Sequence, residues 1–295
     1  MVKMKKKNKN TQLVWYLFLL PSFLGLALFM AYPVMESFRL SFFRSNGTIE
    51  KWAGIDNYIY VFKNAGFWQA VRNTFYIGFF QLLISIPLGF IIASIINQMK
   101  WFKNFFKVIF FIPYVTSIVA AAMVFLYVLH PDMGLLNTLL SSLGLPTSTW
   151  LADSTTARWG VIILSVWHQL GFIIIISLAN LQAIPNDIYE SSSIDGANRF
   201  KQWWFITIPN MTGTFAFFVV MGWIGALKRF SETYILGGLQ GSPGRSLYTI
   251  VGFIYERGFG GNEFGVASAA AYILFAIILI FTIFNLKISK MNKAN

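Results

Sequence analysis

Hydrogen-bonding and aromatic side chains interrupt several of the most apolar stretches of this sequence. The run Trp167-His168-Gln169 falls near the middle of one stretch, and Tyr114 and Ser117 lie in another. Polar groups are costly inside a bilayer. They either line a path for a polar solute or hydrogen-bond between helices, which contributes about 0.6 kcal/mol on average. The candidate path residues are Tyr114, Ser117, Trp167, His168, Gln169 and Trp223.

Covalent catalysis has no comparable support in the sequence. The chain contains no cysteine and only two histidines, which excludes thiolate chemistry and argues against a dedicated metal site. The segment LQGSPGRS is the nearest match to a phosphate-binding loop, but Leu239 replaces its first glycine and Arg245 replaces its lysine. We therefore predict no catalytic residue, metal or nucleotide cofactor in this chain. A hydrolase acting through His168 alone is the remaining enzymatic alternative.

The composition is that of an integral membrane protein. Of 295 residues, 56% are hydrophobic and 12% are charged, whereas a typical soluble domain has about 25% charged residues. A spanning helix needs about 20 mainly apolar residues, and barrel strands would alternate instead of running continuously. The sequence predicts an all-α, polytopic fold of about six transmembrane helices. The apolar runs are Leu13–Pro33, Thr74–Ile96, Val108–Leu129, Trp159–Leu181, Met211–Leu227 and Val266–Leu286.

Lysine clusters predict the orientation of these helices. The formal net charge is +12, but the basic residues gather at the ends of apolar runs without a surface for stacking bases, which argues against nucleic acid. By the positive-inside rule, the lysine-bearing termini and the 97–107 loop belong in the cytoplasm. Arg39, Arg44, Lys228 and Arg229 then fall outside or at the outer interface, against the rule. The clusters comprise Lys3, Lys5, Lys6, Lys7, Lys9, Lys100, Lys103, Lys107, Lys287, Lys290 and Lys293.

One membrane domain is predicted to occupy nearly the whole chain. The predicted regions are a basic cytoplasmic N-terminus (1–12), a transmembrane domain (13–287) and a cytoplasmic tail (288–295). An even number of spans predicts outer loops at 36–72, 130–157 and 229–264 and inner loops at 97–107 and 182–210. A cleaved signal peptide is the alternative for the first run, but that run exceeds the roughly 7–15 residues of such a segment and lacks a cleavage site.

Two outer loops carry apolar residues at helical spacing. The segment 52–74 places Tyr58, Phe62 and Trp68 on one side of an expected amphipathic helix that precedes the second run. The segment 135–143 has leucines at similar spacing, and Gly144 is expected to end its helix. These helices either dock a partner or cap the bundle at the lipid headgroups.

The inner loop at 185–209 is polar, although apolar runs precede and follow it. Asn186 is expected to cap a helix begun after Pro185, and Gly196 to take the left-handed position at its end. A helix of about two to three turns is marginal alone in water. It therefore packs either on the inner ends of this chain's own helices or against a cytoplasmic partner.

The loop resembles the EAA loop of binding-protein-dependent ABC importers. Glu190-Ser-Ser-Ser-Ile-Asp-Gly196-Ala, followed by Ile206-Thr-Ile-Pro209, matches the spacing of Glu-Ala-Ala, Gly and Ile-x-Leu-Pro in that family, with serines for both alanines and isoleucine for leucine. The resemblance implies a coupling helix that docks into a cleft of a cytoplasmic ATPase. The residues it would use are Glu190, Ser191, Ser192, Ile194, Asp195, Gly196 and Ala197.

Further segments extend the resemblance to the carbohydrate-importing branch, which includes the maltose and glycerol-3-phosphate permeases. They are YLFLLPSFLGLALFMAYPVMESFRLSF, GLLNTLLSSLG, LANLQAIPNDIYESSSIDGA and LGGLQGSPGRSLYTIVGFIYERGF. The resemblance implies a type I permease fold, a sugar solute and alternating access. The implied partners are a second permease, two ATPase subunits that bind ATP and Mg, and an extracytoplasmic sugar-binding protein. The alternatives are another solute, such as glycerol phosphate, or an uncoupled channel or scaffold.

Overall fold

A computed structural model describes residues 9–294, so the predicted lysine cluster before Lys9 lies outside the described residues. Helices dominate the chain, with one short hairpin. The α-helices are α1 (Lys9–Leu26), α2 (Tyr32–Leu40), α3 (Asp56–Lys63), α4 (Ala65–Gln98), α5 (Lys103–Val115), α6 (Ile118–Val128), α7 (Leu135–Ser142), α8 (Ala157–Gln182), α9 (Asn186–Ile194), α10 (Arg199–Gln202), α11 (Ile208–Asn210), α12 (Thr212–Leu227), α13 (Ser231–Gly237), α14 (Ile250–Tyr255) and α15 (Phe264–Ala294). The remaining elements are the π-helical η1 (Ala27–Ala31), η3 (Trp203–Thr207) and η4 (Glu256–Gly260), the 3-10 helix η2 (Trp150–Ala152), and strands β1 (Phe43–Ser45) and β2 (Glu50–Trp52).

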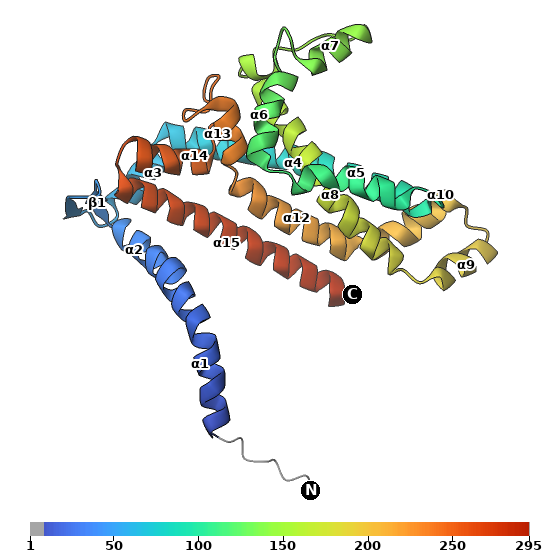
Figure 1. Ribbon diagram of the computed structural model, residues 1–295, viewed down its shortest axis with the longest axis horizontal. Coiled ribbons are helices and arrows are strands. Elements are labelled where there is room, and N and C mark those ends of the chain that lie inside the picture. The colour runs from blue at the N-terminus through green and yellow to red at the C-terminus, as the bar shows by residue number, and fades with distance from the viewer. Residues whose placement is uncertain (1–8, 295) are drawn as a thin grey trace.

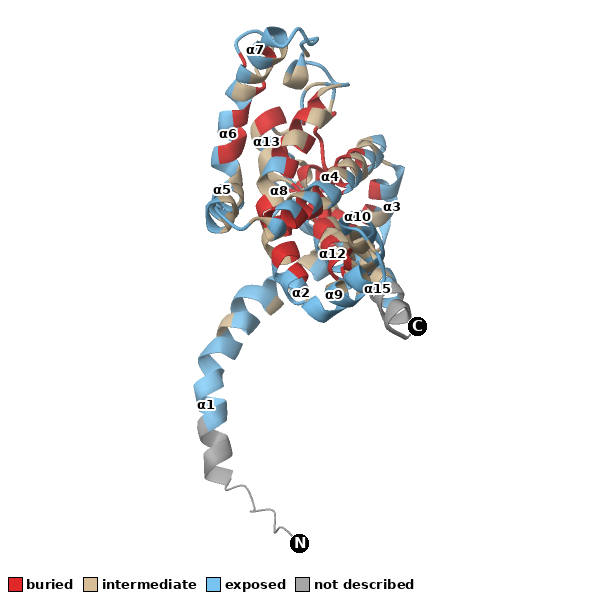
Figure 2. Ribbon diagram, turned by 90° about the vertical axis from the view of Figure 1, so that its right-hand side faces the viewer, coloured by how far each residue is buried: buried red, intermediate tan, exposed pale blue. Residues whose placement is uncertain are grey.

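Four described helices are long and apolar enough to cross a membrane, or up to six if each of two bent pairs counts as one span. The first crossing joins α1, η1 and α2, and it stands apart from the bundle (Figure 2). None of its apolar window is buried. Only its last part packs on the bundle, where Tyr272 Oη donates to the carbonyl of Val34 at 2.5 Å.

Helices α4 and α8 form the centre of the bundle, and α5, α12 and α15 pack around them (Figure 1). Small residues set the closest approaches. A side chain at Gly171 of α8 would lie 2.3 Å from the carbonyl oxygen of Phe110 in α5, and one at Gly222 of α12 would lie 2.2 Å from Leu82 of α4. Helices in membranes associate through such close backbone contacts because lipid supplies no hydrophobic driving force between them.

The third apolar run does not form the single continuous span that we predicted. It divides into α5 and α6, which meet at an angle of 96°. Pro113 lacks a backbone N–H, and Thr116 turns its hydroxyl back to the carbonyl of Pro113 at 2.7 Å. Thr116 and Ser117 are then extended, and a new helix starts. The fifth run, predicted at Met211–Leu227, forms α12, and the chain bends by 58° just before it, between α10–α11 and α12.

The two ends of the bundle carry different structures. Figure 1 places α9 and α10 at one end, β1, β2 and α3 at the opposite end, and α6 and α7 as a projection from the side. Strands β1 and β2 pair antiparallel, with Arg44 opposite Lys51. Their turn is fixed by Asn46, whose side chain accepts from two backbone N–H groups, and by Gly47 at φ +93°. The all-α prediction missed this hairpin.

Candidate functional site

Helix α9 presents one mixed polar and apolar face away from the rest of the chain. Asp187, Glu190, Ser191 and Ile194 recur at intervals of three and four residues, which places them on one side of a helix, and all four are exposed. The Ile194 side chain is 88% exposed. An exposed isoleucine on the same face as two carboxylates is suited to contact a partner surface with an apolar pocket and a basic rim.

The two ends of α9 match the sequence prediction to different degrees. Asn186 does not cap the helix as expected, because Pro185 occupies the N-cap position in an extended conformation and no side chain caps the first turn. Gly196 takes the predicted left-handed conformation at φ +81°. The N–H groups of Gly196 and Ala197 donate to carbonyls of the last turn at 3.1 and 2.9 Å. This Schellman arrangement fixes where α9 stops.

The inward side of α9 is tied to the segment that follows it. Gln202 Nε2 donates to the carbonyl of Tyr189 at 3.0 Å and to the hydroxyl of Ser192 at 2.9 Å. The next residue, Trp203, donates its indole N–H to Ser94 Oγ on α4 at 3.1 Å. These bonds join α9 to the long helix α4 through residues 202 and 203.

The seven predicted coupling residues divide between two environments. No residue of α9 is buried, so packing on this chain's own helices accounts for only its inward side. Glu190, Ser191, Ile194, Asp195 and Gly196 are exposed, whereas Ser192 and Ala197 are half-buried.

A polar cavity of about 310 Å³ lies among α4, α5, α8, α12 and α13. Three of the six predicted path residues line it, namely Tyr114, His168 and Gln169. His168 Nε2 lies 3.2 Å from the carbonyl oxygen of Thr116 at the break between α5 and α6. A carbonyl only accepts, so this ring nitrogen is the donor. The Tyr114 ring stacks on Phe172 at 5.3 Å.

Arg229 forms the centre of a buried polar network beside this cavity. Its guanidinium donates to Ser165 Oγ at 2.6 Å, to the carboxylate of Glu232 and to the side-chain oxygen of Gln81. The Gln81 amide donates in turn to Oε1 of Gln169. The side chains of Arg229 and Glu232 are only 5% and 13% exposed. The network therefore joins α4, α8 and the start of α13.

The other three predicted path residues do not line the cavity. The Trp167 ring packs on Phe125 with centroids 5.4 Å apart. The Trp223 ring lies between the rings of Phe75 and Phe281, with centroid distances of 5.4 and 5.5 Å. It is on the side of α12 that faces α4 and α15. Ser117 is exposed at the N-cap of α6, after the break. These residues came from the correct segments, but helices that are apolar all round give no sequence signal for which side faces the cavity.

Sequence analysis missed several residues that the structure brings to these sites. The network residues Arg229 and Glu232 were assigned to an outer loop, because the burial of Arg229 depends on partners that lie far away in the sequence. Gln202 and Tyr189 gave no local signal, because their roles depend on contacts made only when the loop folds back.

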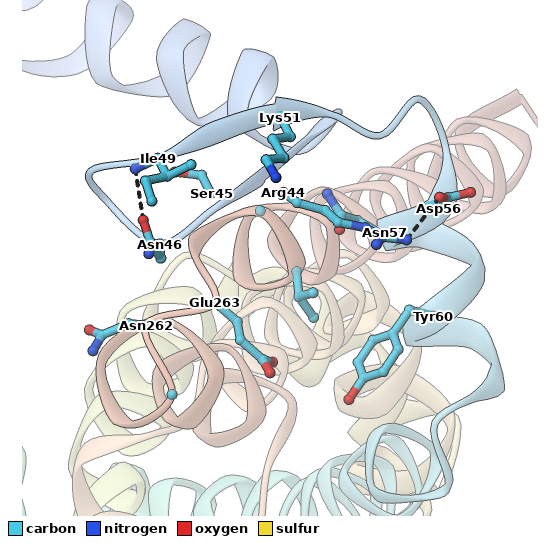
Figure 3. A pocket seen from close by; sticks show the side chains of 13 residues that line it. Arg44, Ser45, Asn46, Ile49, Lys51, Asp56, Asn57, Tyr60, Asn262 and Glu263 are labelled. Atoms are coloured by element: carbon cyan, nitrogen blue, oxygen red, sulfur yellow. Dashed lines mark hydrogen bonds and ion pairs between the residues drawn. The ribbon is translucent and has the colours of Figure 1, made fainter.

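A second cavity, of about 460 Å³, lies at the opposite end of the molecule from α9, between the hairpin, α3 and the start of α15. Figure 3 shows Tyr60 and Glu263 on the side opposite the hairpin, and Arg44 ion-paired with Asp56 at 3.1 Å. In the nearby 238–249 loop, burial raises the pKa of the Tyr248 phenol, which also donates to Glu256. This end therefore combines an exposed ion pair, Arg44 with Asp56, and a buried tyrosine bonded to a glutamate.

Comparisons with known proteins point to one family. The family model described as binding-protein-dependent transport system inner membrane component matches residues 85–291. The probable ABC transporter permease protein YurN of Bacillus subtilis (strain 168) is 34% identical over 97% of this chain and 99% of that protein. The arabinooligosaccharides transport system permease protein AraP of the same organism is 32% identical over 93% of this chain and 88% of that protein. The lactose transport system permease protein LacF of Rhizobium radiobacter is 31% identical over 90% of both chains.

Solved structures agree with these relatives. A bacterial ABC transporter that imports the acidic polysaccharide alginate has a chain with a TM-score of 0.80 and 25% identity, and 96% of both chains is covered. The alginate transporter in complex with an alginate pentasaccharide-bound periplasmic protein gives a TM-score of 0.83 over the same share of both chains. The predicted all-α permease fold is confirmed. The family model matches residues 85–291, and a relative matches nearly the whole chain. This multi-pass membrane chain therefore belongs to the family of binding-protein-dependent transport system inner membrane components.

Proposed function

We propose that this chain is one permease subunit of an ATP-driven importer for a sugar or oligosaccharide. The observation that carries the proposal is that one chain contains both an exposed helix, α9, and a polar cavity inside the bundle. The substrates in the names of the relatives, which are arabinooligosaccharides, lactose and alginate, favour a carbohydrate. Hydroxyl-rich solutes are recognised by amide, imidazole and phenol groups such as those of Gln169, His168 and Tyr114.

The connections within the chain support alternating access as the transport mechanism. An extracytoplasmic binding protein would release its sugar at the end with the hairpin. ATP and Mg would be held by two partner ATPases, whose closure would push α9. The bonds from Gln202 and Trp203 would carry that movement to α4, which lines the cavity through Gln81. The break between α5 and α6 would supply a hinge.

A second, related permease is the proposed occupant beside the first crossing. None of the apolar window from α1 to α2 is buried in this chain. Helices in membranes associate by close packing on other helices, so this window is available to pack on a second subunit. A second subunit would also complete the cavity, which is open on one side in a single chain.

The orientation gives the first prediction. A reporter fused after Asn295 or inserted beside Asn198 will report the cytoplasm, because both positions adjoin lysine-bearing segments. The control is a reporter beside Gly144, which will report the opposite side of the membrane. Reporting from outside at Asn198 would contradict the coupling role of α9.

The solute path gives the second prediction. Replacing His168 and Gln169 together by leucine will lower uptake of the sugar that supports growth of the parent strain. We expect a fall of about tenfold or more, because losing about 1.4 kcal/mol of transition-state hydrogen bonding gives that factor. Radiolabelled uptake is the measurement, with basal ATPase activity and subunit assembly unchanged.

A matched control lies on the same helix. Asn180 is exposed and bonds only within α8, to the carbonyl of Ile176 at 2.9 Å. Asn180→Leu is expected to keep parental uptake. Unchanged uptake in the His168 and Gln169 variant would assign these residues to helix packing instead.

A further inference from the structure

The donors and acceptors of the cavity are fixed by the buried arginine. A guanidinium has only N–H donors, so the Gln81 atom that faces Arg229 is the amide oxygen. The Gln81 NH2 group then faces Gln169, and the Gln169 atom that receives it is again the oxygen. This relay turns the remaining NH2 group of Gln169 into a donor for the cavity that this residue lines.

The charge of the cavity is positive. Among the described residues that line it, Lys228 and Arg229 are the cations and Glu232 is the acid. Glu232 is engaged by Arg229 through an ion pair that is almost completely buried. Lys228, the residue next to Arg229, is exposed and has its charge available to the cavity. Its ammonium group can pair with an oxyanion through charge-assisted hydrogen bonds.

We propose that this cavity recognises an oxyanion on the transported sugar, carried as a carboxylate or as a phosphate ester. The inference rests on the proposed transport function and deepens it by assigning the class of solute. Lys228 supplies the countercharge, and Gln169, oriented through Gln81 by Arg229, donates a hydrogen bond to the same group. A volume of about 310 Å³ is at the lower end of the range for ligand pockets, as expected for one sugar unit.

The absence of cysteine from the chain allows a direct test. Ser231 lines the cavity, so Ser231→Cys introduces a single thiol there with little change in size. In membrane vesicles that contain the assembled importer, the rate of labelling by a water-soluble maleimide is measured with trigalacturonate, glucose 6-phosphate or maltotriose. At a concentration tenfold above its dissociation constant, a bound oxyanion sugar slows labelling about tenfold. Neutral maltotriose is expected to have no such effect.

Variants at Lys228 identify the countercharge. Lys228→Gln in the Ser231→Cys background is expected to remove the protection, and Lys228→Arg to keep it. The matched control is Lys63→Gln, which removes an exposed charge that does not line the cavity and keeps the protection. Protection by trigalacturonate alone assigns a carboxylate, and protection by glucose 6-phosphate alone assigns a phosphate ester.

Three results would overturn the proposal. Equal protection by maltotriose and the acidic sugars, or protection that survives Lys228→Gln, would leave the transport path intact and remove the oxyanion site. A thiol at position 231 that is never labelled would show that water does not reach the cavity, which would also overturn the solute path of the proposed function. Co-purification of the ATPase, measured on the same vesicles, tests the coupling role separately.

Discussion

Replacing Gly196 by aspartate is expected to separate this chain from its proposed ATPase partner while leaving the chain in the membrane. Gly196 sits at φ +81°, where a side chain costs about 1–2 kcal/mol in backbone strain. Apart from Gly196 and its two neighbours in sequence, no residue has an atom within 4 Å of the position that the Cβ would take, so the fold itself has room. The added carboxylate would instead have to be desolvated against the partner, at a cost of several kcal/mol. Co-purification of the ATPase at matched membrane expression is the measurement.

The chain contains a matched control for the backbone strain. Gly144 has φ +70° and equally open surroundings, but it lies in a predicted outer loop. Gly144→Asp is therefore expected to retain the ATPase fully, and Glu190→Lys to weaken retention by reversing a charge on the exposed side of α9. Full retention by Gly196→Asp would reject α9 as the coupling helix.

Positions such as Gly196 and Gly144 are predictable from sequence because their causes are local. A helix that ends needs a residue in the left-handed conformation, and glycine adopts that conformation without a Cβ penalty. The ends of α7 and α9 were found in this way, and the long apolar helices α4, α8 and α15 were found from run length alone.

The interior of the bundle was less predictable, since its contacts join distant parts of the chain. The break after Thr116 depends on Pro113 together with His168, which is 52 residues away. Likewise, the partners of Arg229 are Ser165 and Gln81, which lie 64 and 148 residues away. A loop assignment for Arg229 follows from its neighbours in sequence, whereas its burial follows from partners that only the packed fold supplies.

That buried network gives the largest expected effect on folding. Arg229→Met will sharply reduce the yield and the melting temperature of the purified complex, because it leaves Glu232 and the oxygen of Gln81 without their donor. Removing one partner of a buried ion pair costs about 3–5 kcal/mol, which is a large part of the stability of a typical domain. Thermal unfolding in detergent, followed by size-exclusion chromatography, is the measurement.

Two variants separate loss of the ion pair from loss of the side chain. The double change Arg229→Met with Glu232→Gln removes the uncompensated charge, so it is expected to recover part of the melting temperature lost in Arg229→Met. Arg44→Met breaks the exposed pair with Asp56, whose side chains are 72% and 57% exposed, and exposed pairs contribute only about 0–1 kcal/mol. Its melting temperature should stay close to that of the parent. Equal losses in Arg229→Met and Arg44→Met would mean that burial does not amplify the interaction, and the network would then have no special part in holding α4, α8 and α13 together.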